Sequence, residues 1–230
     1  MLELSDIHVA RGDFALAADL RIAPGARVAI IGPSGSGKST LLSLIGGFLT
    51  PQRGQVSWQG TDLLPLSPGQ RPVSFLFQDQ NLFPHLSVAQ NVGLGLRPDL
   101  RLGPDQQAQV QDALTQVGLR DMGPRKPENL SGGQQSRVAL ARVLLRARPI
   151  LLLDEPFSAL GPALKSEMLA LLGRIADRTR ATVLMVTHDP GDARAFADQT
   201  IVVDQGRAEA PQPTQALLDN PPAALRAYLG

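Results

Sequence analysis

The segment Gly32-Pro33-Ser34-Gly35-Ser36-Gly37-Lys38-Ser39 constrains this chain more than any other, because it fits the pattern G-x-x-x-x-G-K-[ST]. The apolar run at 28–31 before it is typical of a buried strand, and apolar side chains recur at helical spacing after Lys38. Glycines let the backbone curl so that its N–H groups face phosphate oxygens, and the start of a helix adds positive potential. Lys38 can then reach the β- and γ-phosphates of a nucleotide, and the Ser39 hydroxyl can bind Mg²⁺. We therefore favour a phosphate-binding loop over a plain glycine-rich turn.

Charge and composition exclude several other classes of function. The chain has 22 Lys and Arg against 21 Asp and Glu in 230 residues, which gives a formal net charge of +1. A protein that coats nucleic acid needs a surplus of cations to displace counterions, so we expect no nucleic-acid partner. The absence of cysteine from the sequence excludes disulfide scaffolds, thiolate metal sites and cysteine nucleophiles.

Neither a secretory signal nor a membrane-spanning segment is apparent in the sequence. The first six residues, Met1-Leu2-Glu3-Leu4-Ser5-Asp6, lack the basic and then apolar order of a signal. The longest apolar runs, at 28–31, 150–153 and 183–186, are too short to cross a bilayer but have the length of buried parallel strands. We expect a soluble protein whose role at a membrane, if it has one, depends on a partner.

Strand-like and helix-like segments alternate along most of the chain, which predicts an α/β fold with a parallel sheet. The exception is 84–148, where glycines and prolines punctuate a helical pattern. We expect one domain over 1–230, in which about 1–83 and 149–230 form the core and about 84–148 form an inserted helical subdomain. Strands are expected within 2–20, at 27–31, within 54–60, and at 73–77, 150–153, 182–187 and 200–204, and further helices at 162–178, near 193–197 and within 211–230.

Two carboxylates follow the apolar run Ile150-Leu151-Leu152-Leu153. Asp154 ends the expected strand in a position to hold a Mg²⁺-bound water, and Glu155 beside it can polarise an attacking water. The alternative is an acidic strand end that leads into a loop. Because the same chain carries a phosphate loop, we favour the catalytic interpretation.

The string Leu130-Ser131-Gly132-Gly133-Gln134 precedes a helical pattern and has two interpretations. Ser131 and Gln134 fit S-x-x-Q, the capping box that begins many helices. A capping box does not require Gly132 and Gly133, which weaken the start of a helix. Two glycines leave a bare backbone nest that suits a phosphate, so the chain would carry two phosphate-binding elements.

Two single polar residues complete the candidate site. Gln78 follows the expected strand at 73–77, and His188 follows the one at 182–187. Ligands of parallel sheets bind at the carboxyl ends of strands, although an isolated Gln or His at such a place more often has a structural role.

Taken together, these five ordered strings resemble the ATP-binding subunits of ABC transporters. The resemblance covers most of the chain and implies a P-loop NTPase fold of the ABC ATPase type, with an N-terminal antiparallel β part beside a mainly parallel core sheet. It implies ATP and Mg²⁺ as ligands, and a homodimer in which each copy closes over the ATP held by the other. Glu155 would be the general base, with His188, Lys38 and Gln78 also catalytic. The implied nucleotide-binding residues are Gly32, Pro33, Ser34, Gly35, Ser36, Gly37, Lys38, Ser39 and Thr40, with Ser131, Gly132, Gly133 and Gln134 acting across the dimer, and the implied metal-binding residues are Ser39, Gln78 and Asp154.

Further segments narrow the resemblance to the ATPases of thiamine importers. They are Gly47-Phe48-Leu49-Thr50-Pro51, Arg71-Pro72-Val73-Ser74, Leu76-Phe77-Gln78, Asn81-Leu82-Phe83, His85-Leu86, Val88-Ala89-Gln90-Asn91 and Gly93-Leu94-Gly95-Leu96. This resemblance implies thiamine uptake through separate membrane permease subunits, contacted near Gln78, and an indirect dependence on a periplasmic thiamine-binding protein. It also implies a peripheral location at the cytoplasmic face of the inner membrane. The alternatives are the ATPase of another ABC importer or exporter, and a non-transport ATPase of the cell-division adaptor type.

Two positions depart from the family pattern. Arg11 stands near the place where the family usually has an aromatic residue that stacks on adenine. An arginine plane can also stack on a base, and Phe14 is a candidate to replace the missing aromatic ring. Gly161, in Ser158-Ala159-Leu160-Gly161, stands where the family has an Asp that would cap the next helix and lie at the dimer seam.

Overall fold

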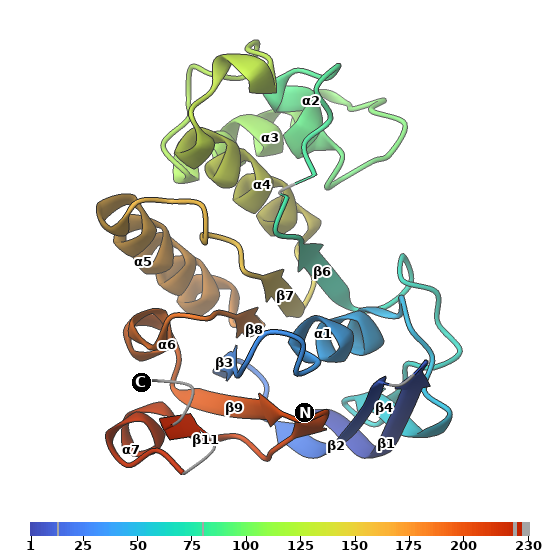
Figure 1. The fold of residues 1–230 in the computed structure, drawn as a ribbon. Helices are drawn as coiled ribbons and strands as arrows, with labels where there is room; N and C mark the ends of the chain where they lie inside the picture. The colour runs from blue at the N-terminus through green and yellow to red at the C-terminus, as the bar shows by residue number, and fades with distance from the viewer. Residues whose placement is uncertain (13, 80, 223–224, 227–230) are drawn as a thin grey trace.

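The strands of the described residues pair into one mixed sheet (Figure 1). The structure is a computed structural model that describes residues 1–12, 14–79, 81–222 and 225–226, without the side chain of Arg11. Along the sheet the order is β5-β4-β1-β2-β10-β9-β3-β8-β7-β6, and β11 pairs with β9. The strands are β1 (Leu2–Arg11), β2 (Phe14–Ile22), β3 (Arg27–Ile31), β4 (Arg53–Trp58), β5 (Thr61–Asp62), β6 (Val73–Leu76), β7 (Ile150–Asp154), β8 (Thr182–Val186), β9 (Gln199–Asp204), β10 (Arg207–Ala208) and β11 (Gln212–Pro213).

The sheet has an antiparallel part and a parallel part. β1 pairs antiparallel with β2 and β4, whereas β9, β3, β8, β7 and β6 are parallel neighbours. The two parts meet at β10, which is parallel to β2 and antiparallel to β9. The expected mainly parallel core sheet with an N-terminal antiparallel part is therefore confirmed.

Alternate side chains of the parallel strands enter two hydrophobic cores on opposite faces of the sheet, because successive residues of a strand point to opposite sides. Val28 and Ile30 of β3 lie in one core together with α1 and the N-terminal strands. Ala29 and Ile31 lie in the other core, together with α5, α6 and α7. Since both faces are covered, β8 is buried along its whole length. The bounds are α1 (Lys38–Gly46), α5 (Pro162–Thr179), α6 (Pro190–Phe196) and α7 (Thr214–Asp219).

A helical insert joins β6 to β7 and forms the upper part of the molecule in Figure 1. It contains α2 (Val88–Gly93), α3 (Pro104–Gln116), a 3₁₀ turn η1 (Pro127–Asn129) and α4 (Gly132–Arg146). Loops therefore interrupt the helical pattern that the sequence predicts over 84–148. One such loop follows α2 and contains Gly95. A Cβ at Gly95 would lie 2.4 Å from the carbonyl oxygen of Arg142 in α4, so only glycine allows this loop to approach α4 so closely.

Some element boundaries differ from the expected ones for local reasons. β6 ends at Leu76, and the side chain of Phe77 is exposed. α6 begins earlier than the segment near 193–197, because the Asp189 side chain accepts a hydrogen bond from the Gly191 N–H and caps the helix. β10 and β11 have two residues each, too few for a hydrophobic pattern. In the part of the chain that the structure describes, no helix combines the length and the apolar character needed to cross a bilayer.

Candidate functional site

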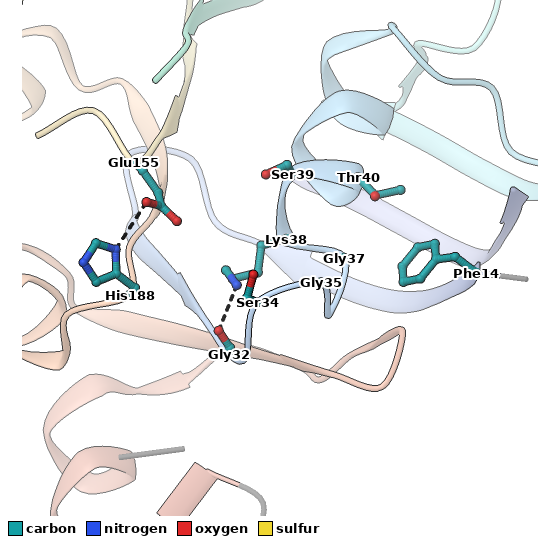
Figure 2. A pocket seen from close by; sticks show the side chains of 10 residues that line it. All are labelled: Phe14, Gly32, Ser34, Gly35, Gly37, Lys38, Ser39, Thr40, Glu155 and His188. Carbon is teal, nitrogen blue, oxygen red and sulfur yellow. Dashed lines mark hydrogen bonds and ion pairs between the residues drawn. The ribbon is translucent and has the colours of Figure 1, made fainter. Parts of the chain in front are cut away.

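A pocket of about 540 Å³ opens where β3, β7 and β8 end (Figure 2). The loop that follows β3 supplies most of the lining, Glu155 follows β7, and His188 follows β8. The carboxyl ends of parallel strands thus bring together three segments that lie far apart in the sequence. The lining residues are Phe14, Gly32, Ser34, Gly35, Gly37, Lys38, Ser39, Thr40, Glu155 and His188.

Close backbone packing requires glycine at the start of the loop between β3 and α1. Gly32 has a φ of 149°, and a Cβ there would lie 1.9 Å from the carbonyl oxygen of Val203. Gly37 has a φ of 112° and immediately precedes α1. Neither conformation is open to other residues at low cost, so the glycines are needed to form this curled loop at the positive end of α1.

Lys38 lies in the centre of the pocket with its side chain largely buried. Its Nζ donates hydrogen bonds to the carbonyl oxygens of Gly32 at 2.8 Å and Pro33 at 2.7 Å. Burial lowers the pKa of Lys38, and the negative charges of Glu155 and Asp154 act in the opposite direction. Because both hydrogen-bond partners of the ammonium are neutral carbonyls, its positive charge stays available to a polyanion bound in this loop.

Ser39 and Asp154 meet beside the pocket, although Asp154 does not line it. The Ser39 hydroxyl lies 3.1 Å from Oδ1 of Asp154 and donates to it. Burial raises the pKa of Asp154, and the hydrogen bond from Ser39 opposes that shift. A hydroxyl and a carboxylate oxygen are ligands that Mg²⁺ prefers, so these two side chains fit a magnesium ion.

Glu155 and His188 contact each other across the ends of β7 and β8. Nδ1 of His188 lies 3.2 Å from Oε2 of Glu155. Glu155 has a φ of 44°, an unusual conformation for a non-glycine residue. This turn directs Glu155 into the pocket, while Asp154 points to Ser39, so the two adjacent carboxylates do face different partners.

Phe14 at the start of β2 lines the pocket on the side of Gly37 and Thr40 (Figure 2). A Cβ on Gly37 would lie 2.7 Å from Cζ of Phe14, so the ring packs directly on the loop. Arg11 is the cross-strand partner of Phe14, but the side chain of Arg11 lies outside the described residues. Of the two candidates for stacking on a base, the structure places Phe14 in the pocket.

Besides Asp154, Pro33 and Ser36, two further groups of expected site residues do not line this pocket. Ser131 caps α4 through the capping box with Gln134, as the sequence predicts, and Gly132 is exposed. Gly133 packs against α5, since a Cβ there would lie 2.3 Å from Cδ2 of Leu164. Gln78 is exposed beyond the end of β6. Within one copy of the chain, therefore, neither segment reaches Lys38.

Gly206 supports the loop between β3 and α1, a role that no sequence pattern indicates. Its N–H donates to the carbonyl oxygen of Ser36 at 3.2 Å. A Cβ on Gly206 would lie 1.9 Å from the carbonyl oxygen of Ala15. The string Asp204-Gln205-Gly206 signals a tight turn, but not the distant segment against which the turn packs.

Known proteins similar to this chain include a transporter family and several of its members. A family model described as ABC transporter matches residues 17–158. The thiamine import ATP-binding protein ThiQ of Cereibacter sphaeroides is 64% identical over 230 residues, which are the full length of both chains. The proteins of the same name from Ruegeria sp. (strain TM1040) and Yersinia pestis are 56% and 51% identical over 230 residues; both alignments cover 100% of this chain, and they cover 100% and 97% of those proteins.

A solved structure shares the fold. It is described as the dimeric, post-hydrolysis state of the ATP-binding cassette MJ0796 bound to ADP and Pi. The match has a TM-score of 0.80 at 32% sequence identity and covers 93% of this chain and 99% of that chain. The mixed sheet with a helical insert is therefore the fold of an ATP-binding cassette.

Proposed function

This chain belongs to the ABC transporter family, and from that membership we propose that it binds and hydrolyses ATP to drive the uptake of thiamine through a separate permease. The ATPase part of the proposal rests on the pocket, which brings Lys38 together with the Glu155–His188 pair. The proposal of thiamine as the transported substrate rests on the full-length similarity to thiamine import ATP-binding proteins.

Lys38 and the loop around it hold the triphosphate of ATP. The Lys38 ammonium already has two carbonyl partners, and phosphate oxygens add charge-assisted hydrogen bonds to the same group. The backbone N–H groups of 34–37 and the first turn of α1, which includes Thr40, surround the phosphates. The loop thereby fixes the γ-phosphate in front of Glu155.

Ser39 and Asp154 are the residues that hold Mg²⁺, as their contact at 3.1 Å supports, and Gln78 is a third ligand supplied from the loop after β6. When bound, Mg²⁺ neutralises charge on the β- and γ-phosphates. The three side chains contribute oxygen atoms, the donor type that this ion requires.

Glu155 is the general base for hydrolysis. It accepts a proton from the attacking water while the water oxygen bonds to the γ-phosphorus and the bond to the ADP oxygen breaks. His188, 3.2 Å from the Glu155 carboxylate, orients that group and senses the γ-phosphate. Lys38 stabilises the negative charge on the phosphate oxygens.

Phe14 stacks on the adenine base. Its ring packs on Gly37 at the edge of the pocket, where a nucleotide held by the loop would extend its base. Arg11 is its cross-strand partner and stays the alternative candidate for stacking on the base, because an arginine plane can also stack on a base. The chain thus moves the aromatic contact from β1 to β2.

The active form is a homodimer that sandwiches ATP. Ser131–Gln134 lie outside the pocket of their own copy, with Ser131 and Gly132 exposed at the start of α4, and suit the γ-phosphate held by a second copy. The dimeric form of the similar cassette MJ0796 supports this arrangement. Gly161 lies at the N-cap of α5 with no side-chain cap, so this chain lacks a carboxylate at the dimer seam.

The permease binds beside Gln78, at an aromatic patch formed by Phe48, Phe75 and Phe77. The rings of Phe75 and Phe77 stack at 4.1 Å, and Phe48 contacts both edge-on at 5.7 Å. The side chains of Phe48 and Phe77 are 55% and 37% exposed, so the patch can bury apolar surface against a partner.

Residues 84–148 act as the helical subdomain beside the aromatic patch. The permease holds the ATPase at the cytoplasmic face of the inner membrane. A periplasmic thiamine-binding protein is an indirect partner, and nucleic acid is not one.

Uptake of labelled thiamine by cells that lack this gene tests the proposal. We expect that loss of the gene lowers uptake and that the wild-type chain restores it. Glu155→Gln should fail to restore it, whereas the matched control Glu209→Gln, at an exposed residue paired with Arg207, should succeed.

Each part of the proposal can fail separately in this experiment. If loss of the gene leaves uptake unchanged in a strain with no second thiamine route, the choice of thiamine is wrong. If Glu155→Gln restores uptake as well as the wild type does, Glu155 is not the base.

A further inference from the structure

We propose that Lys165 is a positioning residue that holds the loop bearing His188 against the pocket, an inference that rests on the proposed function. Lys165 lies in the first helical turn of α5 and does not line the pocket. Its effect on hydrolysis would therefore be exerted through His188 and Glu155.

Lys165 lies between two carboxylates at the start of α6. Its Nζ is 2.6 Å from Oδ2 of Asp189 and 3.1 Å from Oδ1 of Asp192. The side chains of Lys165 and Asp192 are only 17% and 15% exposed, so water screens this contact less than it screens a surface ion pair. One ammonium thus joins α5 to two points on α6.

The same carboxylates fix the backbone on both sides of His188. Thr187 Oγ donates to Oδ2 of Asp192 at 2.9 Å and accepts from the Asp189 N–H at 3.1 Å. Asp189 also caps α6, since its Oδ1 accepts from the Gly191 N–H at 2.8 Å. The two residues that flank His188 in the sequence therefore both belong to the network that Lys165 joins.

His188 depends on this backbone because its ring is poorly enclosed. The His188 side chain is 58% exposed, whereas that of its partner Glu155 is 25% exposed. The contact with Glu155 at 3.2 Å is weakened by a shift of the ring of less than about 1 Å, and the ring moves with the backbone that carries it. An anchor on the flanking residues is what such a ring requires.

Removal of the ammonium would place two negative charges together. The hydrogen bond from Lys165 holds the pKa of Asp189 below its usual range, and the hydrogen bond to Asp189 raises the pKa of Lys165, so both groups are charged at neutral pH. Without Lys165, Asp189 and Asp192 repel each other. Asp192, Thr187, His188 and Glu155 border one cavity of about 10 Å³, enough for about one water, so a displaced Asp192 changes the surroundings of the catalytic pair.

Turnover of ATP by the full chain in complex with its permease tests the proposal. We expect Lys165→Met to lower kcat about 10-fold or more while KM for ATP changes less than about twofold, because a catalytic pair displaced by a fraction of an ångström still allows binding. Lys165→Arg should recover most of the turnover. Arg194→Met is the matched control, since it removes an ion pair with Asp219 from the same helix α6 and should leave kcat unchanged.

A second measurement does not depend on turnover. The sequence has three histidines, His8, His85 and His188, so their ring resonances can be resolved in the labelled full chain. We expect Lys165→Met to shift only the His188 resonances and Lys165→Arg to return them towards the wild-type positions. A merely stabilising role for Lys165 would leave all three unchanged in the folded protein.

Different results would contradict the positioning role of Lys165 and the proposed ATPase function. If Lys165→Met turns over as fast as Arg194→Met, the positioning role is wrong, even when Glu155→Gln is inactive. If Glu155→Gln itself turns over normally, the proposed function is wrong. Should Lys165→Met fail to fold, Thr187→Val removes the hydroxyl from the same network, and the same loss of kcat with unchanged KM is expected from it.

Discussion

At the scale of single residues, Phe14 offers the sharpest test of how this pocket selects its ligand. Its ring packs on the loop between β3 and α1, which we propose to hold the phosphates, and stacking of a base on an aromatic ring contributes about 1–3 kcal/mol. We expect Phe14→Ala to weaken ATP binding by about that amount in calorimetric titrations of the purified chain. Binding of inorganic triphosphate should be unchanged, because that ligand has no base.

The control for this prediction is Phe83→Ala, at an exposed ring that does not line the pocket. An equal loss of affinity for ATP and for triphosphate in Phe14→Ala would mean that the ring supports the loop instead of the base. If Phe14→Ala binds both ATP and triphosphate as tightly as the wild type does, Arg11 is left as the candidate that contacts adenine.

At the scale of elements, the end of α1 depends on Arg71. This side chain is 2% exposed, and its Nη1 donates to the carbonyl oxygens of Leu44 at 2.8 Å and Ile45 at 2.9 Å. Both carbonyls belong to the last turn of the helix. The Leu44 carbonyl also accepts from the Gly47 N–H at 3.2 Å, whereas no N–H of the helix can reach the Ile45 carbonyl. We expect Arg71→Met to lower the free energy of unfolding in urea by about 1–3 kcal/mol, the cost of leaving a buried acceptor such as the Ile45 carbonyl unpaired.

The exposed ion pair of Arg53 with Asp6 provides the comparison. Arg53→Met should cost at most about 1 kcal/mol, because water screens such pairs. If the two variants lose the same free energy, the hydrogen bonds from Arg71 do not stabilise the end of α1.

Sequence patterns predicted those elements whose signals are local. The apolar runs of β3, β7 and β8 and the capping box of Ser131 with Gln134 each lie within a few consecutive residues, and the structure contains all of them. The contacts that the patterns missed join distant segments. Arg71 reaches carbonyls 26 and 27 residues away, and Lys165 reaches carboxylates 24 and 27 residues away. No periodicity encodes such a contact, since only the packing of one element on another brings its two ends together.

At the scale of the whole molecule, the start of α4 should decide whether two copies close over ATP. A Cβ added to Gly132 would meet no heavy atom within 4 Å, as is also true of Gly103 at the N-cap of α3. A larger side chain at either glycine therefore fits the folded monomer. We expect Glu155→Gln with ATP and Mg²⁺ to form a dimer in light scattering after size-exclusion chromatography, because bound ATP is not consumed.

Adding Gly132→Glu to Glu155→Gln should abolish that dimer, since a carboxylate would then face the γ-phosphate held by the other copy. ATP binding to the monomer should be kept, because Gly132 does not line the pocket of its own chain. Gly103→Glu adds the same charge to the same helical insert and should leave the dimer intact. If Gly132→Glu dimerises as readily as Gly103→Glu does, the start of α4 does not meet the second nucleotide, and Gly133 acts only in the packing of α4 against α5.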